Sequence, residues 1–162
     1  MTATTELALN RNDFFPVLFA IESCSLQRLG ATSCRFASFL WRNIDKGVAE
    51  SRADWSLTDW QNRLSQPGVA FYAAYQEMEP AGCFELESAP RLMKSGPAQV
   101  SVRAFGLLPE FTGEGLESWL MTRMAEKGFA MGAGRITLQS DVPLADNFLF
   151  LCRQQGFRLQ ED

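Results

Sequence analysis

The chain has 162 residues, a hydrophobic content of 46% and a net charge of −4, from 15 basic and 19 acidic residues. This length and composition predict one globular domain over residues 1–162, and the acidic balance without a dense basic run argues against nucleic acid as a partner. The longest apolar runs fall well short of the roughly 20 residues that a membrane span needs, and the first residues carry no export signal, so we expect a cytoplasmic protein without a membrane partner.

The chain contains four cysteines and no histidine. The cysteines are widely spaced and form no C-x-x-C pair, which favours buried thiols over a disulfide framework. The absence of histidine excludes histidine-based triads, histidine-ligated zinc and the commonest general base. Acid–base chemistry is therefore expected from carboxylates, cysteine, tyrosine, lysine or water, and no metal site is predicted.

The N-terminal half predicts strands and helices in alternation. Residues 1–16 are polar and aromatic without a clear period. After them the pattern predicts a strand over about 17–24, a helix from a cap at Thr32 or Ser33 to about Asp45 that ends before Gly47, and a helix over 57–64 with Ser56 and Asp59 in a capping box. The runs 69–75 and 81–87 then predict a hairpin with a turn at 76–79, followed by a loop over 88–97.

The central stretch predicts a strand, a turn and a helix in direct succession. An apolar run, Val100–Leu108, ends at Pro109, and the glycine turn Thr112–Gly115 follows. A helix is then predicted from Leu116 to about Met131, with Leu116, Trp119, Leu120 and Met124 along one side. This succession directs unpaired N–H groups and a positive dipole end at one point, which can receive a phosphate.

The C-terminal stretch predicts a strand over Arg135–Gln139, a short helix from Leu144 to about Gln154 that ends at Gly156, and a last strand over Phe157–Gln160. An antiparallel hairpin followed by crossover helices predicts a mixed α/β sheet. In an open sheet of this kind, a ligand tends to lie beyond the strand ends, where neighbouring strands part.

Three stretches between residues 98 and 158 resemble the GNAT superfamily of N-acetyltransferases: Phe105–Phe111 leading into Gly113-x-Gly115, the strand Arg135–Leu138, and the ending Gln155-Gly156-Phe157. The segments around Trp55 and Trp60, Pro80–Gly82 and Glu85–Glu87 resemble one bacterial branch of it. The resemblance implies a GNAT-like single-domain fold with a mixed, mostly antiparallel sheet flanked by helices. It also implies an enzyme that holds acetyl-coenzyme A between two splayed strands and acetylates an amine of a small molecule or peptide.

The resemblance assigns the coenzyme contacts, and this chain departs from the family at several of them. The family pattern is Arg or Gln, two residues, Gly, one residue, then Gly or Ala. The matching residues here are Thr112, Gly113, Glu114, Gly115, Leu116 and Glu117. Two carboxylates beside a pyrophosphate predict weak coenzyme binding, because a like-charge pair about 5 Å apart costs on the order of 3 kcal/mol at an effective dielectric near 20.

Further coenzyme contacts are implied upstream and downstream of this turn. The backbone N–H groups of Leu107 and Leu108 would polarise the thioester carbonyl. An asparagine of the family falls on Ala145, and Asn147 lies two residues further on.

Two residues are candidates for proton transfer. Cys152 stands where the family often carries a tyrosine that protonates the departing thiolate, and a thiol with a pKa near 8.5 can serve as a donor. The alternative is a small core residue facing Phe157. Glu85 lies on a strand that the resemblance makes a wall of the acceptor site, so it is a candidate base, directly or through water, with Glu87 as its alternate. Its alternative is a solvated strand face.

The four tryptophans are expected mainly to pack, although Trp55 and Trp60 are also candidates to select a flat acceptor or to support a homodimer face. Arg103 is expected to pair with Glu85 across the sheet or to reach an anionic acceptor. Two functions remain open. One is an N-acyltransferase that uses acetyl- or another acyl-coenzyme A. The other is a GNAT-fold protein that has lost transfer and serves as a binding or assembly module, as Thr112, Glu117 and Cys152 suggest.

Overall fold

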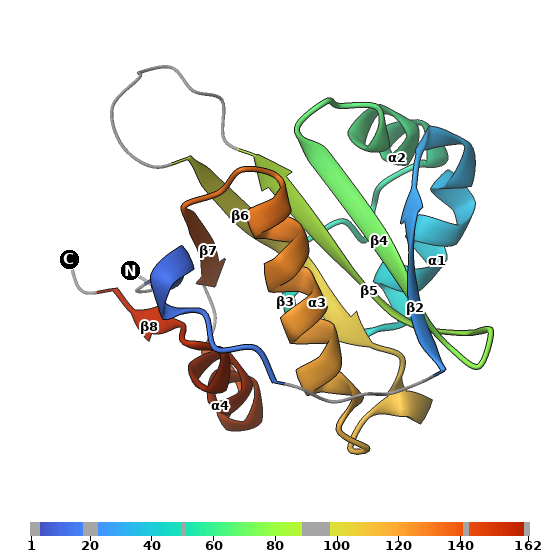
Figure 1. Cartoon of the computed structure of the whole chain (residues 1–162). Coiled ribbons are helices and arrows are strands. Elements are labelled where there is room, and N and C mark those ends of the chain that lie inside the picture. The colour runs from blue at the N-terminus through green and yellow to red at the C-terminus, as the bar shows by residue number, and fades with distance from the viewer. Residues whose placement is uncertain (1–3, 18–22, 50, 89–97, 141–142, 161–162) are drawn as a thin grey trace.

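The computed structural model describes residues 4–17, 23–49, 51–88, 98–140 and 143–160. In this part of the chain an eight-stranded, mostly antiparallel sheet runs in the order β2-β4-β5-β6-β7-β1-β8, and β3 pairs with β6 (Figure 1). The strands are β1 (Thr5–Asn10), β2 (Cys24–Leu29), β3 (Asp45–Ala49), β4 (Val69–Gln76), β5 (Glu79–Ser88), β6 (Gln99–Leu107), β7 (Arg135–Ser140) and β8 (Arg158–Leu159). The helices are α1 (Cys34–Asn43), α2 (Leu57–Leu64), α3 (Leu116–Ala130) and α4 (Asp146–Gln155).

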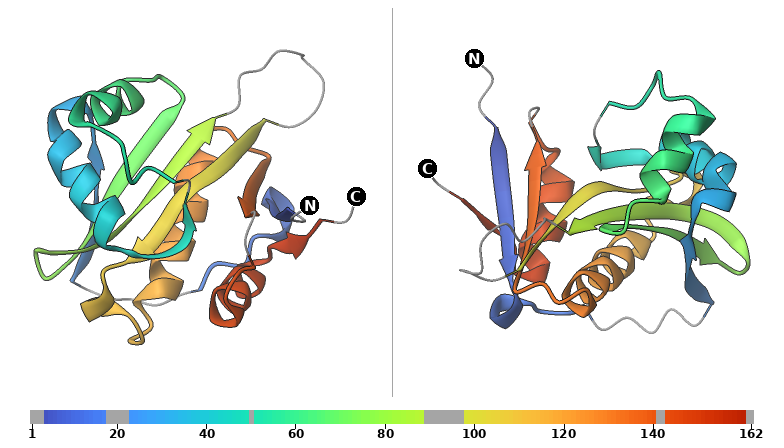
Figure 2. Two further views of the ribbon diagram at one scale, coloured as in Figure 1. Left: turned by 180° about the vertical axis from the view of Figure 1, so that it is seen from behind. Right: turned by 90° about the horizontal axis from the view of Figure 1, so that it is seen from above.

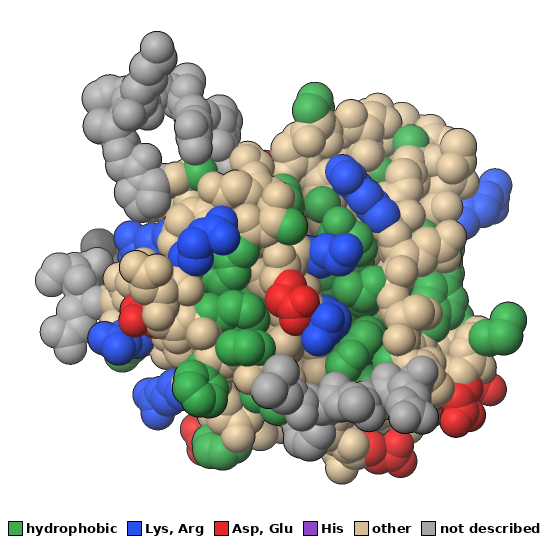
Figure 3. All heavy atoms as spheres, in the orientation of Figure 1, with side chains coloured by type: hydrophobic (Ala, Val, Ile, Leu, Met, Phe, Trp, Pro, Cys, Tyr) green, Lys and Arg blue, Asp and Glu red, His purple; other side chains and the backbone are tan. Residues whose placement is uncertain are grey.

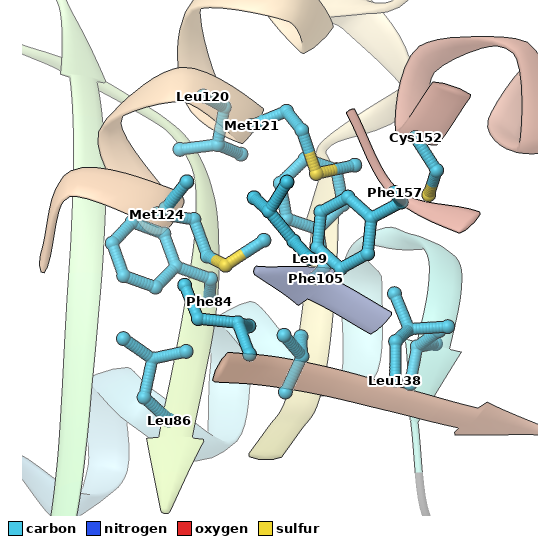
Figure 4. Close-up of a cluster of buried hydrophobic side chains, with 14 of the residues drawn as sticks. Leu9, Phe84, Leu86, Phe105, Leu120, Met121, Met124, Leu138, Cys152 and Phe157 are labelled. Carbon is cyan, nitrogen blue, oxygen red and sulfur yellow. The ribbon is translucent and has the colours of Figure 1, made fainter. Parts of the chain in front are cut away.

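The helices cover both faces of the sheet, α3 and α4 on one face and α1 and α2 on the other (Figure 2). Beneath α3, the side chains of Leu120, Met121 and Met124 point toward Phe84 and Phe105 of the sheet (Figure 4). A second buried cluster, which includes Trp41, Trp60 and Phe71, lies under α1 and α2. Each helix therefore buries its apolar stripe against the sheet, which is the main source of its stability.

The outer face of α3 is charged. Arg123 and Glu126 form an ion pair of 3.1 Å there, and Lys127 Nζ lies 5.3 Å from the ring centroid of Tyr72. Figure 3 shows charged side chains over α3, with hydrophobic side chains on both sides of it.

The sheet opens between β6 and β7. These two parallel strands pair only where Gln99–Ser101 meets Arg135–Thr137. Further along β6, its free edge is taken by β3, which runs antiparallel to it from Asp45 opposite Leu107 to Ala49 opposite Ala104. The point where neighbouring strands part is the usual ligand crevice of an open sheet, and here a segment of the same chain enters it.

Elements with strong local signals follow the sequence predictions. The capping box of α2 is confirmed, because the Asp59 N–H donates to Ser56 Oγ at 3.2 Å and the Ser56 N–H donates to Asp59 Oδ2 at 2.8 Å. The other predicted helices, the hairpin and its turn, and the strands of the C-terminal half are confirmed within a few residues. The four residues predicted along one side of α3 are all buried.

Two predictions differ from the structure, and two others fall mostly outside the described residues. Residues 5–10 carried no predicted element but form β1, because Leu7–Leu9 is buried between β7 and β8. Most of the strand expected over 17–24, and the loop expected over 88–97 except Ser88, lie outside the described residues, and the strand observed nearby is β2. Gly47 lies inside β3 rather than at a helix end, because α1 already ends at Asn43.

Candidate functional site

The turn before α3 has the backbone of an anion-binding loop. Gly113 and Gly115 have φ angles of +84° and +86°, which only glycine adopts without strain. No described atom lies within 4 Å of a Cβ built at either position, so the turn faces open space. Gly115 is also the N-cap of α3 and offers no side chain to its first turn. The N–H groups at this helix end are therefore directed toward a cavity rather than toward a capping side chain.

The cavity beside this turn has a volume of about 610 Å³ and lies between the turn, β3, the end of β6 and α4. It brings together six of the predicted coenzyme contacts: Leu107, Thr112, Gly113, Gly115, Glu117 and Asn147. The other three do not line it. Leu108 and Leu116 are buried in the core, and Glu114 is exposed.

An acidic side chain of the chain itself occupies the anion position of the turn. The Gly113 N–H donates a 2.8 Å hydrogen bond to Oε1 of Glu117, four residues further on. The hydroxyl of Thr112 turns inward and donates to the Pro109 carbonyl at 2.9 Å. The carboxylate of Glu117 therefore stands where a ligand's anionic oxygen would accept the same N–H group.

The end of β6 is paired on both sides. Leu107 lies opposite Gly82 of β5 on one edge and opposite Asp45 of β3 on the other. The N–H of Leu108 donates to the Ala81 carbonyl at 2.7 Å. The expectation of a free N–H on Leu108 is thus corrected for this conformation, and its contact with a thioester stays a prediction.

The segment β3 is fixed from both faces of the sheet. A Cβ placed on Gly47 would overlap the ring of Phe148 from α4, so the backbone of β3 packs directly on this ring. The Phe148 ring in turn lies 5.8 Å from that of Phe105, centroid to centroid. On the opposite face, Lys46 Nζ lies 4.6 Å from the ring centroid of Trp41. The sequence predicted none of these contacts, because residues 45–49 carry no strand pattern of their own.

Glu85, the candidate base, is completely buried in a network of arginines. Arg52 donates to both of its carboxylate oxygens, with an Nη1–Oε1 distance of 3.0 Å, and Arg63 Nη2 lies 3.0 Å from Oε2. The guanidinium of Arg52 stacks 4.5 Å above the Trp55 ring. The arginines occupy both carboxylate oxygens and hold the side chain in place, which leaves neither oxygen free to reach a proton of an acceptor. Its role as a base stays a prediction.

Glu87 continues the same network toward the surface. It accepts from Arg63 Nη2 at 2.8 Å and from Arg103 Nε at 3.0 Å. Arg103 therefore pairs with Glu87, whereas the sequence had suggested a pair with Glu85. Hydrogen bonding to Arg63 lowers the pKa of Glu87, although partial burial opposes this shift.

Cys152, the candidate acid, belongs to α4 and is fully buried beside Phe157 (Figure 4). Burial raises the pKa of this thiol to about 12. A thiol with so high a pKa is a weak proton donor, and its surroundings correspond to the core residue that the sequence left as the alternative. Its role as an acid stays a prediction.

The tryptophans divide between core and surface. Trp60 has no exposed surface and contacts the rings of Trp41, Trp55 and Phe71 edge-on or nearly so. Trp55 is partly exposed and lines a second cavity of about 490 Å³ together with Asp54, Asp59, Asn62, Arg63 and Gln66.

A known protein family matches the stretch of the chain that contains the glycine turn, the parted strands and the cavity. The model of the acetyltransferase (GNAT) family matches residues 36–157, about three quarters of the chain. The chain belongs to the GNAT family of acetyltransferases. No curated protein sequence matches this GNAT chain.

Several solved structures share the GNAT fold with this protein. An aminoglycoside acetyltransferase from an uncultured soil metagenomic sample, in complex with sisomicin, superposes with a TM-score of 0.66 at 14% identity, over 85% of this chain and 90% of that chain. A ribosomal-protein-alanine N-acetyltransferase from Brucella melitensis gives 0.60 at 14% identity, over 82% and 90%. A functionally unknown conserved protein from Staphylococcus epidermidis gives 0.68 at 15% identity, over 97% of this chain but 57% of that chain.

GNAT acetyltransferases as a family use acetyl-coenzyme A, so we asked whether the residues present fit this group. In this conformation they do not. The carboxylate of Glu117 already accepts the hydrogen bond of the Gly113 N–H, and β3 fills the gap between β6 and β7.

Among the described residues, no helix is long and apolar enough to cross a membrane.

Proposed function

We propose that the protein is an N-acyltransferase that moves an acetyl or other acyl group from coenzyme A to a primary amine of a small molecule or peptide. The observation that carries this proposal is the bond between the Gly113 N–H and a carboxylate oxygen, at a glycine turn that opens on a cavity of about 610 Å³. The Gly113 N–H is thus able to donate to an anionic oxygen, and the family supplies the reaction class.

Two of the solved structures with this fold illustrate the range of amine acceptors. One is an aminoglycoside acetyltransferase and the other a ribosomal-protein-alanine N-acetyltransferase. Their low identity to this chain does not choose between them, so the acceptor is proposed only as a primary amine. The cavity beside Trp55 supports an acceptor that is positively charged, because Asp54 and Asp59 line it and carboxylates attract cations. Arg63, which also lines it, is already paired with Glu85 and Glu87.

Proton transfer in this proposal is assigned to water rather than to a dedicated side chain. Glu85 is held by arginines on both oxygens, and burial raises the pKa of Cys152 to about 12. A Glu85→Gln variant that remains folded and keeps the wild-type kcat would remove Glu85 as the base.

A second candidate function is a GNAT-fold binding or assembly module that no longer transfers an acyl group. The observation that favours it is the pairing of β3 with β6 at the place where a thioester ligand is expected. The two candidates differ in whether the protein ever binds the coenzyme.

Thermal unfolding with and without millimolar acetyl-coenzyme A separates the two candidates, because a ligand at 100 times its Kd stabilises the folded state by about 2.7 kcal/mol. Mass spectrometry of sisomicin and of a peptide with an N-terminal alanine, each incubated with acetyl-coenzyme A, then tests for a product 42 Da heavier, with heat-denatured protein as control. No stabilisation, together with no acetylated product, would favour the binding module and reject the acyltransferase.

A further inference from the structure

The edge of β6 that faces the gap is already paired with other strands of the chain. On its other edge, β6 pairs with β5 from Val100 to Leu107. On the gap side, β7 takes only the first residues of β6, and β3 takes Ala104–Leu107. An extended ligand that entered the gap would bind by adding itself to this edge. In this structure the backbone of β3 already occupies the edge in the same way.

The position of β3 in the gap depends on Gly47, which has no side chain. Its register on β6 shifts between Lys46 and Val48, so that Gly47 forms the irregular point of the strand. At this point the backbone lies against Phe148, and any Cβ would overlap the ring. Val48 beside it is buried in the same cluster as Phe105 and Phe148. Glycine at position 47 therefore permits a close contact that seats the strand between the sheet and α4.

A second group of the chain fills the other end of the same cavity. Glu117 and β3 both line it, Glu117 at the turn and Asp45–Gly47 along the gap. The carboxylate of Glu117 satisfies the Gly113 N–H within the chain, without the loss of translational freedom that a bound anion incurs. A ligand with an anionic arm must displace this carboxylate and is also repelled by its charge.

We propose that this conformation is a closed form of the cleft, in which β3 and the carboxylate of Glu117 hold the places of an acyl-thioester ligand with an anionic arm, and that the ligand binds only when both have left. The identity of the ligand rests on the proposed function. In a closed form of this kind, the apparent Kd exceeds the intrinsic Kd by the inverse of the open fraction. If the open form is about a tenth of the population, releasing β3 tightens binding about tenfold.

Two substitutions open the cleft, and each has a matched control. Gly47→Ala places a methyl group against Phe148 and expels β3, whereas Gly30→Ala adds the same group where no described atom lies within 4 Å. Glu117→Ala removes the carboxylate that accepts the Gly113 N–H, whereas Glu110→Ala removes an exposed carboxylate that does not line the cavity. We expect Gly47→Ala and Glu117→Ala each to lower the Kd of acetyl-coenzyme A about tenfold by calorimetry, and the two controls to change it less than twofold.

Amide hydrogen exchange reports on the strand directly. Peptides that contain residues 45–49 are expected to be protected in the free wild type, and to exchange faster in Gly47→Ala and in any variant saturated with acetyl-coenzyme A. If the Phe148 ring yields instead of β3, Lys46→Pro removes a strand N–H at an exposed position and serves as the second opening variant.

The outcomes separate the closed cleft from the proposed function. Wild-type protein that binds acetyl-coenzyme A while residues 45–49 keep their protection overturns the closed form and leaves the acyltransferase standing. Opening variants whose residues 45–49 exchange rapidly but which still bind no acetyl-coenzyme A overturn the acyltransferase and the displacement by this ligand, while the protection of β3 in the wild type still supports the self-occupied gap.

Discussion

Arg52 and Glu85 form an ion pair in which neither side chain has any exposed surface. The guanidinium donates to both carboxylate oxygens and lies over the rings of Trp55 and Trp60, at 4.5 and 5.1 Å from their centroids. Two buried charges are tolerated only when each compensates the other, because the interior solvates neither. The pair therefore ties the chain before α2 to the middle of β5, on the face opposite α3.

Removing the arginine of this pair should be strongly destabilising. Arg52→Met keeps most of the packing on the tryptophans but removes the fully buried partner of Glu85 and leaves the partly exposed Arg63 on Oε2. We expect a loss of about 3 kcal/mol in the free energy of unfolding at pH 7, measured by urea denaturation. Arg103→Met breaks a half-exposed pair and should cost less than about 1 kcal/mol. Equal losses in the two variants would show that burial does not decide the effect.

A double variant tests whether the loss comes from an uncompensated charge. Adding Glu85→Leu to Arg52→Met removes the buried carboxylate, and it should recover part of the stability lost in the single variant. A double variant that is less stable than the single one by the full effect of Glu85→Leu alone would assign the loss to packing on Trp55 and Trp60 instead.

The ion pairs of Glu87 predict a pH dependence at low pH. Hydrogen bonding to Arg63 lowers the pKa of Glu87 below its usual range. A lowered folded-state pKa adds stability above the unfolded-state pKa of about 4.3, and this stability disappears as the pH falls through the folded-state pKa. Glu87→Gln should therefore be less stable than wild type by up to about 1 kcal/mol at pH 7, and the difference should shrink by pH 3. A difference that stays constant over this range would contradict the assignment.

Local signals predicted much of the fold. The capping box at Ser56 and Asp59 and the glycine turn before α3 are set by neighbours in the sequence, and both are where the pattern placed them. β1 and β3 were missed because their partners are far away in the chain. β1 pairs with β7 more than 120 residues later, and Asp45–Ala49 becomes a strand only by pairing with β6.

In the candidate site, too, local features were predicted and contacts between distant segments were not. The sequence identified the turn and its unfavourable Glu117, because both belong to one short motif. It did not identify Arg52 as the partner of Glu85, which lies 33 residues away, or the entry of β3 beside Gly47 and Phe148. These relationships depend on how distant segments meet, and no periodicity or cap marks them.

Gly156, at the end of α4, lies too close to another part of the backbone to carry a side chain. Gly156 has a φ angle of +110°, and a Cβ added there would overlap the carbonyl oxygen of Asp13. Gly132, with a φ angle of +94°, has no described atom within 4 Å of an added Cβ. Gly132→Ala should therefore cost about 1–2 kcal/mol for the left-handed backbone alone. Gly156→Ala should cost clearly more, because the backbone at Asp13 must also move. Urea denaturation of both variants measures the difference. Equal costs would mean that the contact with Asp13 yields freely.

Two buried thiols predict a loss of stability at alkaline pH. Burial raises the pKa of Cys152 to about 12, and burial, aided by the charge of Glu85, also raises the pKa of Cys83. Because these folded-state pKa values exceed the unfolded-state value of about 8.5, the unfolded chain loses its thiol protons first and stability falls as the pH rises above it. Each thiol should lower the free energy of unfolding by about 1.4 kcal/mol per pH unit in this window. Measured by urea denaturation at pH 8, 9 and 10, Cys152→Ala should show a shallower decline than wild type by about that amount between pH 9 and 10. Parallel declines would show that Cys152 ionises in the folded state, and would return it to consideration as a proton donor.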